Sequence, residues 1–359
     1  MPVRFEALDA VRGVAALVVL GAHYAPPLGM SAFPSAYYAV DLFFCLSGLV
    51  LGHAYLSAIE SGLSLRKFLG RRLARLYPIY VIAIVLGGAA LLASYAQHRT
   101  ELTPEQTLTA AALNILFLPF EHQSATQIGV HEVRGALFPL NDPAWSLFFE
   151  LVVNLAFFVV VRVAGKRVIP WVALISGACL MLVIAKGHAQ DGWGYGWTHL
   201  FSGLARSGTF FFLGAWLSTF GMKPVLRGRF LMAPCMLVAV VVTASLPANV
   251  YTTAIALLSV PVLVHLGHRI SPPRGWAPIC DALGQMSYPL YCLHIPLLMF
   301  ADVSGVLPLA AQSGFTICLL FLTPIVLSSV AAYVYETPVR QWLLRGIERR
   351  ALPSRMNQA

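Results

Sequence analysis

Charged side chains are scarce in this sequence: Asp, Glu, Lys and Arg make up only 11% of its 359 residues, whereas 58% are apolar. A soluble domain of this size carries a larger charged surface. Apolar runs of about 17–25 residues recur along the chain, and each is long enough to cross a bilayer core of about 30 Å as a helix. The composition therefore predicts an all-α membrane protein built from many spanning helices.

The sequence also lacks the patterns of a disulfide framework, a zinc site or a cleaved leader. Its six cysteines fall inside apolar runs without Cys-x-x-Cys spacing, which is typical of buried packing positions. The first apolar run contains Asp9 and Arg12 and has no small-x-small cleavage site, so we expect it to be retained as a helix. We expect no metal site and no internal repeat.

Hydropathy predicts about ten spans. They cover residues 7–26, 36–57, 76–96, 144–164, 168–186, 199–220, 230–247, 249–267, 278–302 and 308–335. The segment 106–120 is shorter and ends near a proline, so we expect a re-entrant or interfacial helix there. Residues 1–335 are then one transmembrane domain, and residues 336–359 form a short basic tail.

The net charge of +9 raises the question of nucleic-acid binding. The basic residues, however, sit in short segments between apolar runs, where orientation signals lie. With ten spans, most of the 24 Lys and Arg residues fall on one side of the membrane. The positive-inside rule then places both termini in the cytoplasm, and we expect no nucleic-acid partner.

The first predicted helix carries Arg12 and His23 on nearly the same face, because eleven residues make about three turns and about 16 Å of rise. Ionisable groups inside a span are unfavourable unless they face a bundle interior or a cavity. A structural alternative is that Arg12 reaches the lipid headgroups and His23 lies in the outer interface.

Four further ionisable residues fall at a depth similar to that of His23, on four other predicted spans: Asp41, Glu150, Arg206 and His294. A histidine beside a carboxylate is the usual arrangement of a general base. We therefore predict a catalytic layer in which His23 is the base and Asp41 or Glu150 orients it. Arg206, or a hydroxyl or indole donor such as Ser146 or Trp145, stabilises the developing negative charge.

A basic cluster precedes the third predicted span in "LRKFLGRRLARLYPIY". Its members are Arg66, Lys67, Arg71, Arg72 and Arg75. One interpretation is anchoring on lipid phosphates. The other is a binding site for a phosphorylated substrate, since guanidinium groups bind phosphate with paired hydrogen bonds.

At these residues the chain resembles the acyltransferase-3 family of integral membrane O-acyltransferases. The resemblance covers nearly the whole chain in order, through "LDAVRGVAALVVLGAH", "AVDLFFCLSGLVLG", "FLGRRLARLYPIY", "NDPAWSLFFELVVN", "MSYPLYCLHIP" and "YETPVR". It implies ten spans in a bacterial inner membrane, a cytoplasmic acyl-CoA donor, and an acceptor hydroxyl near the outer face.

The resemblance also implies roles by position. His23 matches the family's essential histidine and Arg12 its partner; the other matched positions are Asp41, Ser47, Gly48, Arg71, Arg72, Arg75, Pro78, Trp145, Ser146 and Glu150. We assign Arg12, Ser47, Gly48 and the basic cluster to donor binding. Trp145, Ser146, Tyr288 and His294 are assigned to the acceptor side. Leu49 departs from the family, which often has an aromatic residue after Ser-Gly.

The expected function is transfer of an acyl group, most simply acetyl from acetyl-CoA, to a hydroxyl of a glycan or other polyol. Transfer is either direct or through a transient acyl-histidine. The competing hypothesis is a transporter or flippase of a glycan or lipid-linked substrate, in which the ionisable layer relays protons. The sequence shows no inverted repeat or paired broken helices in support of that second reading.

Overall fold

The computed structural model describes residues 5–186, 195–220, 226–227, 232–307 and 313–349. Its helices are α1 (Glu6–Tyr24), α2 (Tyr37–Glu60), α3 (Leu65–Ala96), α4 (Pro104–Asn114), α5 (Ala144–Ala164), α6 (Ile169–Ala185), α7 (Leu200–Leu217), α8 (Met232–Ser245), α9 (Val250–Gly267), α10 (Ala277–Val303), α12 (Gly314–Ala331) and α13 (Thr337–Arg349). Two short sheets complete the fold: antiparallel β1 (Ala125–Ile128) and β2 (His131–Arg134), and parallel β3 (Leu226–Arg227) and β4 (Ile270–Ser271). The predicted all-α class is confirmed.

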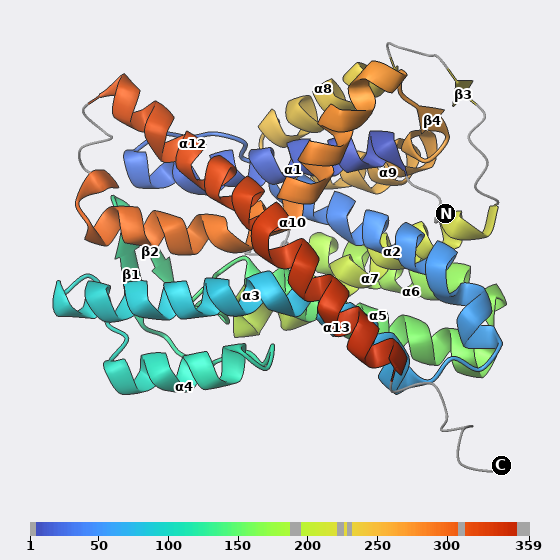
Figure 1. Ribbon diagram of the computed structural model, residues 1–359, viewed down its shortest axis with the longest axis horizontal. Helices are drawn as coiled ribbons and strands as arrows, with labels where there is room; N and C mark the ends of the chain where they lie inside the picture. The colour runs from blue at the N-terminus through green and yellow to red at the C-terminus, as the bar shows by residue number, and fades with distance from the viewer. Residues whose placement is uncertain (1–4, 187–194, 221–225, 228–231, 308–312, 350–359) are drawn as a thin grey trace.

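The centre of the bundle is made by α1, α2, α3, α7 and α10, which pack along one another (Figure 1). Glycine permits the closest approaches. A side chain on Gly13 would overlap Leu283 of α10, and one on Gly48 would overlap the carbonyl oxygen of Phe211 in α7. Small residues at such crossings let helix backbones touch, which is the usual packing of membrane helices.

Seven helical segments among the described residues are long and apolar enough to span a bilayer: Glu6–Leu28, Tyr37–Glu60, Leu65–Ala96, Ala144–Ala164, Lys166–Ala185, Val250–Gly267 and Gly314–Arg349. Seven of the ten predicted spans therefore coincide with helices that are long and apolar enough to cross a membrane. The other three coincide with α7, α8 and α10, which are helical but fall short in length or mean hydropathy. Most of the described residues of α7 and α10 are buried against other helices, so these helices tolerate polar side chains that lipid-facing helices do not.

The third helix begins earlier than predicted. It starts at Leu65 rather than at residue 76, and Ser64 caps it by accepting a hydrogen bond from the backbone N–H of Lys67. The basic cluster is therefore helical, and Arg72 and Arg75 share a face three residues apart. Pro78 lies inside this long helix, not at its start.

The segment 106–120 contributes α4, which runs beside α3 (Figure 1). The C-terminal end of α4 is held by two tyrosine hydroxyls of α3: Tyr77 donates to the carbonyl of Ile115, and Tyr80 to that of Asn114. Tyr80 lies sixteen residues before the end of α3, or about 24 Å at the helical rise. This depth favours a re-entrant helix over one lying flat on the membrane surface.

The outward faces of the bundle are apolar. Trp171, Leu174, Leu258 and Phe315 are all more than 60% exposed, and exposed apolar area on this scale indicates contact with lipid. The predicted basic tail is helical from Thr337 to Arg349 and joins α12 through a π-helical turn. Residues 350–359 of the tail, and the loop residues Lys223 and Arg229, lie outside the described residues.

One polar cluster fastens the segment between α3 and α5 onto the end of α10. The buried carboxylate of Asp302 accepts hydrogen bonds from Arg99 (2.8 Å) and from the backbone N–H of Gly129 (3.1 Å), and Gln97 donates to the carbonyl of Val303. The hairpin β1–β2 is thereby held at one end of the bundle. α1 begins and α13 ends near the opposite end (Figure 1).

Candidate active site

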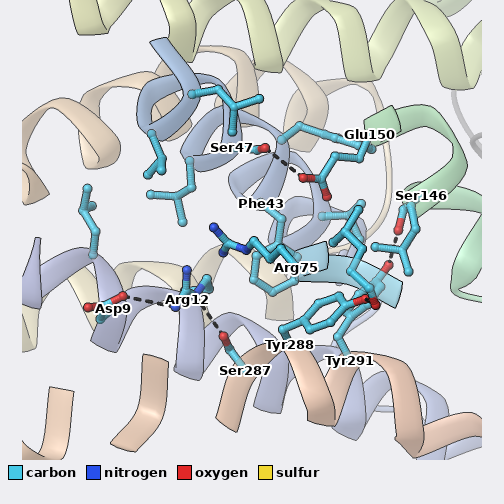
Figure 2. Close-up of a pocket in the computed structure, with 18 of the residues that line it drawn as sticks. Asp9, Arg12, Phe43, Ser47, Arg75, Ser146, Glu150, Ser287, Tyr288 and Tyr291 are labelled. Carbon is cyan, nitrogen blue, oxygen red and sulfur yellow. Dashed lines mark hydrogen bonds and ion pairs between the residues drawn. The ribbon is translucent and has the colours of Figure 1, made fainter. Parts of the chain in front are cut away.

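A cavity of about 560 Å³ lies among α1, α2, α3, α5 and α10. We call it the basic cavity because Arg12 and Arg75 line it (Figure 2). Its other polar lining residues are Asp9, Ser47, His53, Ser146, Glu150, Ser287, Tyr288 and Tyr291. Most of its remaining lining is leucine, valine, alanine and phenylalanine. The cavity thus combines a cationic region with a long apolar wall.

The two lining arginines differ in how they are held. Arg12 donates to Ser287 Oγ (2.9 Å), to the Gly284 carbonyl (2.8 Å) and to Asp9 (3.1 Å), so its position is fixed. Arg75 has no hydrogen bond or ion pair within the described part of the chain. The two guanidinium groups point into the same region and repel each other electrostatically (Figure 2). An anion bound between them would relieve that repulsion.

Glu150 is clamped at the wall of this cavity by two other helices. Its Oε1 accepts a hydrogen bond from Ser47 of α2 (2.9 Å) and from Arg72 of α3 (2.5 Å). The Arg72 side chain is only 5% exposed and that of Glu150 18%. These bonds connect α2, α3 and α5. Glu150 is thus bonded to Ser47 and Arg72, and it does not orient His23.

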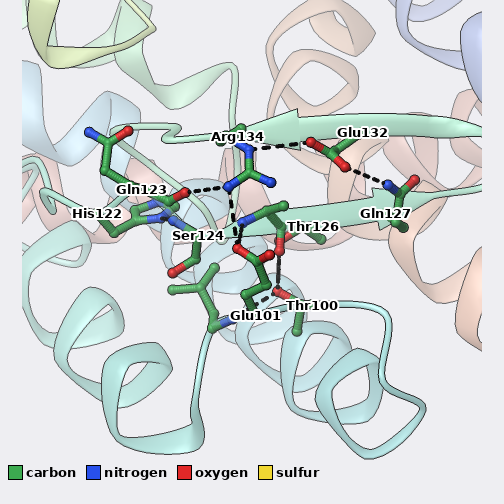
Figure 3. Close-up of polar contacts among 11 residues, drawn as sticks. Thr100, Glu101, His122, Gln123, Ser124, Thr126, Gln127, Glu132 and Arg134 are labelled. Carbon is green, nitrogen blue, oxygen red and sulfur yellow. Dashed lines mark hydrogen bonds and ion pairs between the residues drawn. The ribbon is translucent and has the colours of Figure 1, made fainter.

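A second cavity, of about 330 Å³, lies toward the other end of α1. We call it the histidine cavity because His23 lines it together with His122 and His131. The hairpin β1–β2 supplies one wall, and a polar network around Arg134 supports that hairpin (Figure 3). His122 uses both ring nitrogens within this network: it donates to the Ala136 carbonyl and accepts from the Ser124 N–H. Burial lowers the pKa of His122, so this histidine is a neutral structural residue.

The hydrogen bonds around His23 define its tautomer. His294 Nδ1 lies 2.9 Å from the Leu290 carbonyl, which can only accept, so Nδ1 of His294 carries the proton and its Nε2 is an acceptor. His23 Nδ1 lies 3.0 Å from the Val19 carbonyl and 3.2 Å from His294 Nε2, so it too carries a proton. The remaining nitrogen, Nε2 of His23, has no hydrogen-bond partner among the described residues and keeps its lone pair, which is the form a general base requires.

The two cavities approach each other closely. On α10, Tyr291 lines the basic cavity and Ile295 lines the histidine cavity. At the start of α5, Ser146 lines the basic cavity and Asp142 lines the histidine cavity. Each pair is four residues apart, about one helical turn. The Tyr291 and Ser146 hydroxyls are hydrogen bonded to each other (2.7 Å) at this boundary.

Asp41 does not orient His23, contrary to the expectation from its depth. Both of its carboxylate oxygens are bonded to Arg206, at 2.5 and 2.7 Å, and Arg206 also donates to the Tyr37 carbonyl. Asp41 is 0% and Arg206 1% exposed. These two predicted catalytic residues therefore bind each other between α2 and α7, and neither lines either cavity.

Only some of the residues predicted to bind the donor line the basic cavity. Of the basic cluster, Arg75 reaches the basic cavity and Arg72 braces it through Glu150, whereas Arg71 pairs with Glu348 of α13. Arg66 is exposed and Lys67 is partly exposed, and neither lines the cavity. Gly48 packs against α7 instead of the donor site.

The predicted acceptor residues divide between the two cavities. Ser146 and Tyr288 line the basic cavity, and the Tyr288 hydroxyl donates to the Leu76 carbonyl. His294 is 1% exposed and contacts His23. Trp145 packs against Phe149 and lines neither cavity.

The sequence analysis did not assign three residues of interest to the site. Tyr291 stands three residues after Tyr288 and three before His294, so helical spacing along "SYPLYCLHIP" gave a usable signal for it. Ser287, the partner of Arg12, lies in the same motif. Asp142 gave a weaker signal, as an acidic residue in "NDPAW" with no basic neighbour in sequence.

Comparison with known proteins identifies the family to which this chain belongs. A family model described as an acyltransferase domain matches residues 5–334. The chain is also 38% identical, over 195 residues, to a Rhizobium radiobacter protein named "Protein 2 in picA locus"; the match covers 52% of this chain and 97% of that protein. No solved structure matches. Because the family model spans nearly the whole chain, this multi-pass membrane protein belongs to the acyltransferase 3 family and is an acyltransferase.

Proposed function

We propose that the protein transfers an acetyl group, or a related acyl group, from cytoplasmic acyl-CoA to a hydroxyl of a glycan or other polyol at the outer face of a bacterial inner membrane. The observation that carries this proposal is the meeting of the two cavities within one turn of α10. One holds cationic groups suited to a phosphorylated donor, and the other holds a histidine with a free lone pair.

The proposed topology places both ends of the chain in the cytoplasm. The basic segments 66–75 and 162–167 connect spans on the side where α1 begins, as the positive-inside rule requires. The basic cavity then faces the cytoplasm. The hairpin β1–β2 and the histidine cavity face outward.

The donor would lie along the basic cavity. Arg12 and Arg75 would bind phosphate oxygens of coenzyme A, since Arg75 has no protein partner in the described structure and both groups face the same space. The pantetheine arm would follow the apolar wall past Phe43. The thioester carbonyl would then reach the hydroxyl pair of Tyr291 and Ser146 at the boundary between the cavities.

His23 would act as the general base in the transfer. Its Nε2 takes the proton of the acceptor hydroxyl as the oxygen forms a bond to the thioester carbonyl carbon. The tyrosine or serine hydroxyl at the boundary donates a hydrogen bond to the resulting oxyanion. The carbon–sulfur bond then breaks, and the thiolate of coenzyme A takes the proton from His23, which leaves an ester and free coenzyme A.

The donor site is tested by Arg75→Ala. We expect the KM for acetyl-CoA to rise about 10–100-fold, because a charge-assisted hydrogen bond contributes about 1.5–3 kcal/mol, with little change in kcat. The KM for acetyl-pantetheine, which has no phosphoanhydride or 3′-phosphate, should not change. Arg167→Ala, at an exposed arginine outside both cavities, is the matched control. An equal loss with both donors would contradict phosphate binding by Arg75.

The positioning of His23 is tested at His294. His294→Leu removes one of the two acceptors of the His23 Nδ1–H, so that only the Val19 carbonyl holds the ring, and we expect kcat to fall about 10²-fold with little change in either KM. His294→Gln offers a carbonyl oxygen in place of Nε2 and should restore part of kcat. The pH profile of kcat should shift only in the leucine variant. Equal activity in the leucine and glutamine variants would show that the bond to His23 is not used.

A further inference from the structure

Resting on the function proposed above, we propose that the histidine cavity binds an uncharged polyhydroxyl acceptor, such as a neutral sugar ring, through the carboxylate of Asp142, and that it disfavours anionic acceptors.

Asp142 is intermediate in exposure, and its carboxylate forms no hydrogen bond or ion pair with the described residues. It precedes Pro143, at the start of α5, and lines the histidine cavity with His23. Its Oδ1 is inaccessible to solvent and has no hydrogen-bond partner in the described structure. Burial raises the pKa of Asp142 to about 6. An enclosed polar atom without a partner is unfavourable, and groups of this kind are often found at functional sites.

The charge in this cavity is not positive. Arg134 is the one guanidinium or ammonium group among the described lining residues, and it is already paired with Glu132 (3.3 Å) and Glu101 (3.5 Å) (Figure 3). Glu132 lines the cavity as well. An anionic ligand would therefore meet the Asp142 carboxylate without a free cation to offset the repulsion.

The cavity has the chemistry of a site for a neutral hydroxyl compound. A carboxylate accepts hydrogen bonds from one or two hydroxyl groups, and each such charge-assisted bond is stronger than a neutral one. Tyr195 and Met299 supply apolar surface on the same lining, against which the carbon face of a ring can pack. The volume of about 330 Å³ lies at the small end of ligand pockets, which suits a single ring-sized unit.

The test uses the full-length protein in nanodiscs with acetyl-CoA. The probes are the methyl glycosides of glucose, galactose, mannose and N-acetylglucosamine, with methyl glucuronide and methyl galacturonide as anionic counterparts. Acetylated products are quantified by mass spectrometry. We expect the neutral glycosides to be acetylated in preference to the uronides. Asp142→Asn should raise the KM for the accepted glycoside about tenfold or more, with the KM for acetyl-CoA unchanged. The same variant should show a smaller preference for neutral glycosides over uronides. Glu121→Gln, at an exposed carboxylate outside the cavity, is the matched control.

A thermal unfolding measurement separates binding from a structural role. Removing a carboxylate charge that has no partner among the described residues should leave the unfolding temperature of Asp142→Asn equal to or above that of the wild type at pH 7.5. The inference is overturned if the uronides are the better acceptors, if no glycoside is acetylated while coenzyme A is still released, or if Asp142→Asn leaves the acceptor KM unchanged. Absence of any His23-dependent coenzyme A release would instead overturn the proposed function itself.

Discussion

Replacing His23 with alanine is expected to lower the rate of acyl transfer by about 10²–10⁴-fold, the usual contribution of a positioned general base. The structure gives the reason: His23 lines a cavity, and its Nδ1–H is directed toward His294 and the Val19 carbonyl, which leaves Nε2 free to take a proton. The rate is best followed as coenzyme A released from acetyl-CoA, separated by chromatography. Thiol reagents are unsuitable because Cys235 and Cys318 are exposed free cysteines.

The variant must be shown to fold. His23→Gln, which keeps most of the side-chain volume, should lose activity as completely as His23→Ala while retaining the wild-type elution profile and unfolding temperature. His98→Asn is the matched control, since His98 is exposed and has a φ of 56°, a conformation that asparagine tolerates. A folded His23→Gln protein with undiminished transfer would exclude His23 as the base.

The second large effect is expected at the buried pair of Asp41 and Arg206. Asp41→Asn removes the carboxylate to which two nitrogen atoms of the Arg206 guanidinium donate, and Arg206 is only 1% exposed. Breaking such a pair from one side lowers the free energy of unfolding by about 3–5 kcal/mol. The double variant Asp41→Leu/Arg206→Met removes both charges together and should recover most of that loss. Thermal unfolding in detergent measures both.

A solvent-exposed pair is the control for this experiment. Glu348→Gln removes the partner of Arg71, and exposed pairs of this kind contribute only about 0–1 kcal/mol. The activity of each folded variant adds a second readout. If Asp41→Asn kept the wild-type unfolding temperature but lost acyl-transfer activity, Asp41 would have the direct catalytic role that its predicted depth along the second span suggested.

The sequence was informative about membrane segments and about depth along a helix. Hydropathy located the spans, and eleven-residue spacing placed Arg12 and His23 on one face of α1, where they now line the two cavities. Both properties depend on local patterns of one helix. Helical spacing also pointed toward the α10 motif, in which His294 contacts His23.

The sequence was uninformative about which helices are neighbours. The sequence predicts similar depths for His23, Asp41 and Glu150, yet these residues belong to three separate clusters, with His294, Arg206 and Arg72 respectively. Depth fixes one coordinate of a residue in a bundle; the other two depend on helix order and rotation, which arise from packing such as the Gly48 contact with α7. The pairing of the ionisable groups therefore required the three-dimensional structure.

The single helical turn that separates the two cavities has a consequence for the membrane as a barrier. With the proposed topology, only the few atoms of an acyl group pass the layer formed by Tyr291 and Ser146, while coenzyme A and the acceptor each remain in their own compartment. No alternating access of the whole protein is needed, and the bilayer stays insulated against ions during turnover. Cleavage of the thioester also makes the passage one-way, so that chemical energy, rather than a concentration gradient, sets the direction of acyl export.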